Sequence, residues 1–459
     1  MDPTPPPMPA IDRPGPRQRV LWLSTVAFTV LFAVWLMLGI LGLEIKKDAG
    51  LMLGNAAASM TEAEQKAAVE TRFEWLLAVA ILSGSLLRLN FGIWADRYGG
   101  RNMMVLLLLA SAVPTFWLGH ASSYPELLAC AALFGLAGNS FSVGIAWNSA
   151  WFPAKSKGTA LGVFGAGNVG ASGTKLLVVL FPSILTLVPA AGLAGGLIPG
   201  GWRFVPTLYA VLLVLTAAAV LVLSPRPDRM PGRGRPLGEM LAPLRHVQVW
   251  RFSLYYVVVF GAYVALSAWL PNYLRNTYGV DLRTAALLTA LYIFPASLLR
   301  PLGGWLSDRY GPRAVTYAVF IGMTVALVPL CLPSSMLTLG VGAFTALMFA
   351  VGVGMGIGKA SVYKYIPNYF PKDVGAVGGL VGLFGALGGF VLPPTFGWLG
   401  RAAGSPQAAF YVLLVLTVAS LAWLHVAVMR IKAAGRRADP ARVEAAVTAA
   451  TPATSSRGR

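Results

Sequence analysis

The sequence predicts an all-α membrane protein in which 12 transmembrane helices form two pseudo-symmetric six-helix bundles. The chain has 459 residues, of which 56% are hydrophobic and only 12% are charged. One crossing needs about 20 apolar residues, so this length has room for roughly a dozen spans. In addition, one long motif occurs in each half of the chain, which indicates a duplicated six-helix unit.

Twelve apolar stretches of spanning length divide into two sets of six around an Arg- and Pro-rich connection. The first set lies near residues 20–43, 74–93, 103–120, 125–151, 158–181 and 204–223, and the second near 252–273, 284–305, 314–332, 337–366, 374–399 and 407–429. The predicted organisation is an N-terminal tail (1–19), a first bundle (20–223), a linker (224–251), a second bundle (252–429) and a C-terminal tail (430–459).

The basic residues are distributed unequally between the two sides of the predicted membrane. The net charge is +19, and about 23 of the 36 Lys and Arg residues fall in segments on one side against about 8 on the other. The positive-inside rule therefore places both termini in the cytoplasm. We expect the protein in a bacterial inner membrane. This placement favours a lipid bilayer rather than nucleic acid as the partner of the positive charge. The two cysteines lie in apolar runs, and we predict no metal and no cofactor.

The repeated motif reads SLLRLNFGIWADRYGGR from Ser85 to Arg101 and SLLRPLGGWLSDRYGPR from Ser297 to Arg313. Its Asp residues, expected in loops, can cap or pair with neighbouring helix ends, and its Gly residues permit close helix approach. Such contacts would favour one packing of the two halves over another. We predict a conformational latch formed by Asp96, Arg97, Arg101, Asp308, Arg309 and Arg313.

The element GIWADRYGGR, repeated as GWLSDRYGPR, resembles the loop motif of the major facilitator superfamily. The fifth and eleventh spans, GTALGVFGAGNVGASGTK (158–175) and GAVGGLVGLFGALGGF (375–390), resemble the nitrate/nitrite porter family within it, over about residues 20–430. Asn168 fits the second Asn of that signature, whereas Val163 and Phe164 stand where the first is expected. The dense glycines are expected to allow close helix packing, at Gly162, Gly165, Gly167, Gly170, Gly379, Gly382 and Gly385.

No carboxylate lies deep in any predicted span. Five cations lie within the spans, namely Arg88, Lys175, Arg300, Lys359 and Lys364. A buried Arg costs roughly 2.5 to 3.5 kcal/mol on insertion scales. An anion about 4 Å from two arginines gains about 4 kcal/mol with each at an effective dielectric of about 20, which exceeds their mutual repulsion. A guanidinium also matches a planar oxyanion bidentately. Arg88 and Arg300 are therefore predicted to bind an anion, although bonds to backbone carbonyls or snorkelling would also accommodate them.

The family resemblance implies further binding residues. Phe141 and Tyr256 match positions that sandwich or hydrogen-bond the flat anion, and Asn168 could supply an amide donor. The three lysines within the spans resemble features of one branch of the family, and we treat them as secondary charge sites: Lys175, Lys359 and Lys364. Lys364 is close to a span end and could instead snorkel.

These features predict a monomeric carrier of nitrate and nitrite that works by alternating access. Exchange of nitrate for nitrite is favoured because the spans hold no deep carboxylate and the three histidines lie near span ends or in the linker. The alternatives are nitrate/proton symport through a lysine, transport of another small anion, and an anion sensor that completes no transport cycle. No effector domain and no enzyme motif such as HExxH, GxSxG or a Walker loop stands out in the sequence.

Overall fold

The computed structural model describes residues 14–172, 174, 177, 182–332, 336–405 and 407–450. Within these residues the chain is helical, and the only extended pairing is an isolated bridge between Leu193 and Ile198. Lys175 and the outermost parts of both predicted tails lie outside the described residues.

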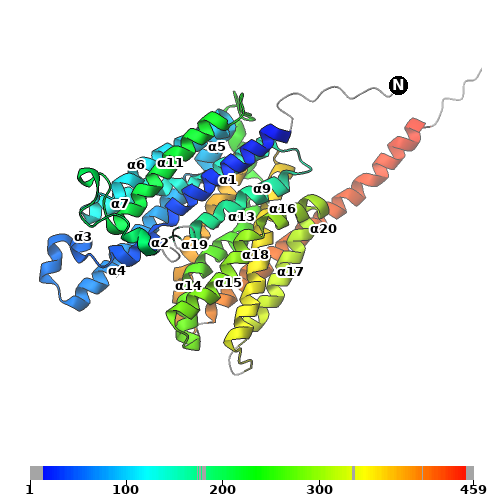
Figure 1. Ribbon diagram of the computed structural model, residues 1–459. Coiled ribbons are helices and arrows are strands. Elements are labelled where there is room, and N and C mark those ends of the chain that lie inside the picture. The colour runs from blue at the N-terminus through cyan, green and yellow to red at the C-terminus, as the bar shows by residue number, and fades with distance from the viewer. Residues whose placement is uncertain are drawn as a thin grey trace, which may run out of the picture.

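The N-terminal half contains the helices from α1 to α11, and most of the α-helices among them are labelled in Figure 1. They are α1 (Pro14–Leu36), α2 (Leu38–Ile45), α3 (Ala49–Leu53), η2 (Gly54–Ser59), α4 (Glu62–Leu86), α5 (Arg88–Tyr98), α6 (Gly100–Leu118), α7 (Tyr124–Phe134), η3 (Gly135–Asn139), α8 (Ser140–Trp151), α9 (Lys157–Ala166), η4 (Gly167–Val169), η5 (Pro182–Leu185), η6 (Ala194–Gly196), η7 (Gly201–Arg203) and α11 (Phe204–Leu223).

The linker and the C-terminal half contain the remaining helices. They are α12 (Leu237–Leu241), η8 (Ala242–Arg245), α13 (Val247–Tyr256), the π-helical turn η9 (Val257–Gly261), α14 (Ala262–Tyr278), α15 (Leu282–Leu298), α16 (Arg300–Tyr310), α17 (Pro312–Cys331), α18 (Val341–Tyr369), α19 (Val374–Ala402) and α20 (Ala408–Ala450).

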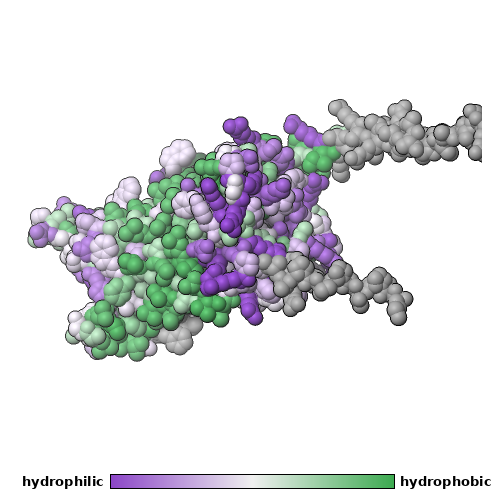
Figure 2. All heavy atoms as spheres, turned by 90° about the horizontal axis from the view of Figure 1, so that it is seen from above, coloured by the Kyte–Doolittle hydropathy of each residue, from purple (hydrophilic) through white to green (hydrophobic). Residues whose placement is uncertain are grey.

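The predicted all-α membrane fold is confirmed. Ten helical stretches among the described residues are long and apolar enough to cross a membrane, or eleven when the bent pair α15 and α16 counts as one span. The predicted fifth span, 158–181, includes residues outside the described part, and α9 and η4 lie along its course. Figure 2 shows an apolar band across the middle of the visible face, with hydrophilic atoms gathered toward the ends. Helices α1 and α20 extend into the segments that we predicted as tails.

The second and eighth spans break at the same position of the repeat. Leu87 (φ −88°, ψ 4°) separates α4 from α5, and Leu299 (φ −83°, ψ 4°) separates α15 from α16. The second of these breaks bends the span by 40°, and Pro295 contributes to it because proline has no amide hydrogen to donate within the helix. In both halves the first residue after the break is an arginine, so the break positions Arg88 and Arg300 at equivalent places.

The two halves contact each other mainly through α5 with α19 and α9 with α16. In Figure 1 the halves approach near α9 and α16 and diverge toward α3 and the α14–α15 turn. Glycine pairs make the close approach possible, because a Cβ at Gly92 would overlap the carbonyl of Gly375 and one at Gly304 that of Gly158. We call the end of the molecule that carries these glycine pairs and the linker the linker side.

Candidate functional site

Two buried arginines from opposite halves form the centre of the candidate site. Arg88 begins α5 and is 0% exposed, and Arg300 begins α16 and is 2% exposed. The Nε of Arg88 donates to the carbonyl of Gly84 (3.0 Å), and its Nη1 donates to the carbonyl of Gly382 (2.9 Å). The first bond holds the guanidinium against its own helix, and the second joins it to α19 of the other half.

Arg300 makes the corresponding contact in the opposite direction. Its Nη1 donates to the carbonyl of Gly165 on α9 (2.8 Å), and its Nη2 donates to the hydroxyl of Tyr256 at the end of α13 (2.9 Å). A Cβ at Gly165 would lie 3.0 Å from the Nε of Arg300, so this position has room for the guanidinium only because it is glycine. Each arginine is thus bound to a glycine carbonyl of the opposite half.

The ring of Phe141 of α8 lies close to both guanidinium groups. The ring centroid is 5.8 Å from the Cζ of Arg88 and 5.2 Å from that of Arg300, so the two Cζ atoms lie within about 11 Å of each other and repel by about 1.5 kcal/mol at an effective dielectric of about 20. The rings of Tyr256 and Phe260 lie nearly parallel to that of Phe141, at interplanar angles of 10° and 3°. Both arginines therefore lie close to a set of nearly parallel aromatic rings.

Buried polar atoms of two predicted site residues have no hydrogen-bond partner among the described residues. They are Nη2 of Arg88 and both the Nδ2 and Oδ1 atoms of Asn168, a residue that is 1% exposed. Buried donors without partners are costly, so the Nη2 of Arg88 and the Nδ2 of Asn168 favour a ligand that accepts hydrogen bonds. The hydrogen-bond partners described for the two arginines are carbonyls and a phenol, and none of them is a carboxylate.

Two of the predicted lysine sites lie on α18, five residues apart. Lys359 is 0% exposed; its Nζ donates to the carbonyl of Ala296 (2.9 Å) and lies 3.1 Å from the centroid of the Tyr263 ring. Lys364 is 4% exposed and forms an ion pair with Asp308, so it does not snorkel to the surface in this structure. The third predicted lysine, Lys175, is outside the described residues.

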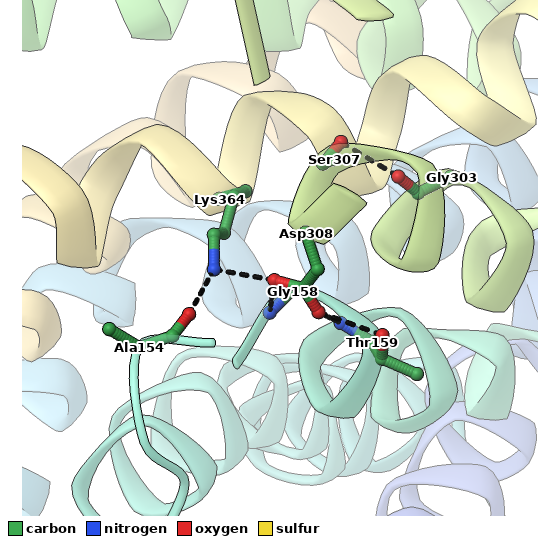
Figure 3. Close-up of polar contacts among 7 residues, drawn as sticks. All are labelled: Ala154, Gly158, Thr159, Gly303, Ser307, Asp308 and Lys364. Carbon is green, nitrogen blue, oxygen red and sulfur yellow. Dashed lines mark hydrogen bonds and ion pairs between the residues drawn. The ribbon is translucent and has the colours of Figure 1, made fainter. Parts of the chain in front are cut away.

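Asp308 joins the two halves on the linker side (Figure 3). Its carboxylate accepts hydrogen bonds from the amide of Gly158 (2.9 Å) and from the amide and hydroxyl of Thr159 (2.6 and 2.7 Å), in the first turn of α9. Lys364 donates to the same carboxylate and to the carbonyl of Ala154. A carboxylate is favoured at this place because the N-terminus of a helix carries unpaired amides and partial positive charge.

Asp96 has the equivalent place in the other half of the repeat. It accepts a hydrogen bond from the amide of Gly375 (2.8 Å), in the first turn of α19. Our expectation that Asp96 and Asp308 lie in loops is wrong, because both belong to the last turns of α5 and α16. Each helix continues until a glycine with positive φ, Gly99 (90°) or Gly311 (82°), and only then turns.

The arginines of the predicted latch have contacts within their own halves. The Nη2 of Arg101 donates to the carbonyl of Leu221 (2.9 Å), and the Nη2 of Arg313 donates to the hydroxyl of Tyr369 (2.8 Å). Arg97 and Arg309 lie beside aromatic rings of their own helices. Among the described residues, the contacts given for these four arginines do not cross between the halves.

The linker carries a partly buried polar contact that sequence reasoning missed. Asp228 accepts hydrogen bonds from the Nε1 atoms of Trp147 and Trp151 (3.1 and 3.0 Å) and from the amide of Arg101 (3.0 Å). Farther along the linker, Arg235 pairs with Asp373 of the C-terminal half (2.7 Å). The signal in the sequence was an acidic residue in an otherwise basic linker, RPDRM.

The predicted glycines lie against the functional side chains and α1. A Cβ at Gly162 would overlap the carbonyl of Arg300, and one at Gly379 would approach that of Arg88. The remaining positions are close to other parts of the same interior: Gly382 to Tyr363, Gly385 to Tyr256, and Gly167 and Gly170 to Thr29 of α1.

Comparisons with known proteins show the family and the fold. A family model described as Major Facilitator Superfamily matches residues 23–339 and 252–456. A Thermus thermophilus protein named "Probable nitrate/nitrite antiporter NarK1" is 55% identical over 434 residues, which cover 92% of this chain and 93% of the relative. A Bacillus subtilis "Nitrite extrusion protein" is 29% identical over 413 residues, which cover 89% and 95%. The structure of the E. coli fucose:proton symporter matches with a TM-score of 0.66 at 14% identity, covering 88% of this chain and 98% of the symporter, which shows the fold alone.

Proposed function

The chain belongs to the Major Facilitator Superfamily, and on that premise we propose that it is a secondary-active transporter of nitrate and nitrite that works by alternating access. The curated relatives named for nitrate and nitrite transport support this substrate class and the resemblance found in the fifth and eleventh spans. The protein is in this proposal a transporter and not an enzyme.

The observation that carries the proposal is the pair of buried arginines that both lie close to the ring of Phe141. Arg88 and Arg300 come from opposite halves and have carbonyl and phenol partners instead of a carboxylate. Two buried positive charges are stabilised most directly by a ligand that carries the missing negative charge. The ligand is a small anion because both side chains are almost completely enclosed.

The shape of the site favours a planar anion. Nitrate and nitrite are flat, and a guanidinium donates two parallel hydrogen bonds to two oxygens of such an anion. The rings of Phe141 and Tyr256 offer a flat surface close to the charges. The unpaired Nη2 of Arg88 and the amide of Asn168 supply further donors, so we assign substrate binding to these residues together with Arg300.

The transport cycle follows from charge and from the contacts on the linker side. Without an anion, the two arginines repel each other across the interface of the halves; a bound anion screens this repulsion and lets the halves reorient. A protein that reorients readily only when loaded exchanges nitrate for nitrite. We place the protein in a bacterial inner membrane. The linker side and both termini then face the cytoplasm, in accordance with the positive-inside rule. We treat the monomer as the transporting unit.

Proton-coupled nitrate uptake is the competing scheme. Lys359 is a fully buried ionisable group close to the site and would be the group that carries the proton. The two schemes predict different requirements, because exchange needs an anion inside the vesicle and symport needs a proton gradient.

Labelled-nitrate uptake by purified protein in liposomes tests the proposal. Liposomes are loaded with nitrite, with nitrate or with neither, at equal pH and with an inward proton gradient in a parallel series. We expect uptake only into liposomes that contain nitrate or nitrite. Gradient-driven uptake into empty liposomes would establish symport instead, and absence of nitrate uptake in every condition would reject nitrate as the substrate.

A further inference from the structure

The carbonyl four residues before each central arginine has a different partner in the two halves. In the N-terminal half this carbonyl belongs to Gly84 and accepts a hydrogen bond from the Nε of Arg88 itself (3.0 Å). In the C-terminal half it belongs to Ala296, at the equivalent place of the repeat, and accepts from the Nζ of Lys359 (2.9 Å). The lysine therefore performs for one half the contact that the arginine performs in the other.

The ammonium of Lys359 is held from a second direction by an aromatic ring. Its Nζ lies 3.1 Å from the centroid of the Tyr263 ring, a cation–π geometry. The hydroxyl of Tyr263 is in turn hydrogen-bonded to the Oγ of Ser297 (2.8 Å), the residue that follows Ala296. Lys359 is thus fixed against the last turn of α15, immediately before the break at Leu299.

The two arginines point in different directions as a consequence. Arg88 turns back to its own helix through Nε, whereas Arg300 extends both Nη atoms to Gly165 and Tyr256, toward the centre of the site. We propose that Lys359 is a positioning residue for Arg300: by occupying the carbonyl of Ala296, it keeps the guanidinium turned to the anion. This inference rests on the proposed function, because it assigns Lys359 to the same anion site.

The repeat explains why only one half has such a lysine. Phe152 and Pro153 recur as Phe370 and Pro371, and in the same register the residue equivalent to Lys359 is Phe141. One half therefore contributes a ring close to both arginines, and the other half contributes a cation that orients one of them. The two arginines are chemically identical but are held by different means.

The first test is nitrate affinity, measured as Kd on purified protein, together with the maximal rate of nitrate/nitrite exchange in liposomes. We expect Lys359→Met to raise the nitrate Kd about tenfold, the effect of losing one hydrogen bond that holds a charged group, with an exchange rate at saturating nitrate within about twofold of the wild type. Lys372→Met removes an exposed lysine from the same half and is the matched control. An unchanged Kd for Lys359→Met would overturn the proposal, as would loss of exchange at an unchanged Kd.

Two further substitutions separate hydrogen bonding from charge. Lys359→Arg and Lys359→Gln each keep an N–H donor for the carbonyl of Ala296, and only the first keeps the charge. If Lys359 acts by holding Arg300, both restore most of the nitrate affinity. If Gln is as weak as Met while Arg is active, charge alone is responsible and the proposal is wrong. These two variants decide the question even where Lys359→Met does not fold.

A double-mutant cycle tests whether Lys359 acts through Arg300. Tyr256→Phe removes a second partner of Arg300, so its effect combined with Lys359→Met should be smaller than the product of the two single effects. Combined with Asn168→Ala, which does not touch Arg300, the effects should multiply. If the single effects on nitrate Kd multiply in both cycles, Lys359 contacts the anion directly and the proposal is overturned. Failure of the wild-type protein to bind nitrate would instead reject the proposed function.

Discussion

Replacement of either central arginine by lysine tests whether the site recognises the shape of the anion or only its charge. A guanidinium has five N–H donors in a fixed planar fork, and an ammonium has three on a single nitrogen. In the structure Arg300 uses two donors for Gly165 and Tyr256, so three remain for an anion. A lysine that kept the same two partners would have one donor left and could not bind two oxygens of the anion at once.

The expected loss follows from this difference. Removing one charge-assisted hydrogen bond costs about 1.5 to 3 kcal/mol, which corresponds to a rise in nitrate Kd of about tenfold to 150-fold. Arg88→Lys should have an effect of similar size, because Arg88 also commits two donors to carbonyls of Gly84 and Gly382. The net charge of the site is the same in the wild type and in both variants.

Nitrate Kd on purified protein and KM for exchange in liposomes are the measurements. Arg401→Lys makes the same chemical change at an exposed position of the C-terminal half and is the matched control. Kd values within about twofold of the wild type for both Arg88→Lys and Arg300→Lys would refute the reasoning, because the site would then recognise charge and not a planar fork.

Three further predictions concern the contacts around the site. Asp308→Asn should favour opening of the linker side by about 1 to 3 kcal/mol. Asp96→Asn should favour it by less, because Asp96 accepts one described hydrogen bond across the halves. Distances between spin labels on the α8–α9 and α18–α19 loops measure the opening, and equal effects of the two substitutions would contradict the prediction. Gly165→Ala should weaken nitrate binding about tenfold by crowding Arg300, whereas Gly342→Ala, with open space around it, should leave Kd unchanged. Asp228→Ala should lower the Tm by several degrees, because two buried indole N–H groups lose their acceptor; an unchanged Tm would mean that the linker contact adds no stability.

The spans and the two arginines could be predicted from the sequence because both depend on local signals. Apolar length fixes a span, and an uncompensated Arg in a repeated apolar segment is conspicuous whatever its neighbours are. Asp96 and Asp308 were predicted as latch residues from the repeat. Their places inside helices were not predicted, since the motif does not show that the helix continues to the following glycine.

The partners of the lysines could not be predicted because they come from distant parts of the chain. Lys364 pairs with Asp308, and Lys359 binds the carbonyl of Ala296, which no sequence pattern marks as available. The same holds for Asp228, whose acceptor role depends on Trp147 and Trp151 meeting the linker in space. Contacts of this kind are set by packing between elements, and a single sequence gives the residues without the register between them.

The anion site and the linker-side contacts lie on the same two helices, and this arrangement couples them. Arg88 and Asp96 are the first and ninth residues of α5, and Arg300 and Asp308 hold the same places in α16, so each pair is separated by about 12 Å of continuous helix. Each arginine binds a glycine carbonyl of the opposite half, and each aspartate caps a helix of that half. A helix of this length is rigid compared with the contacts at its ends, so the halves cannot separate at the aspartates without disturbing the hydrogen bonds of the arginines. Binding of an anion to the arginines therefore changes the free energy of opening at the linker side, which is the coupling that exchange requires.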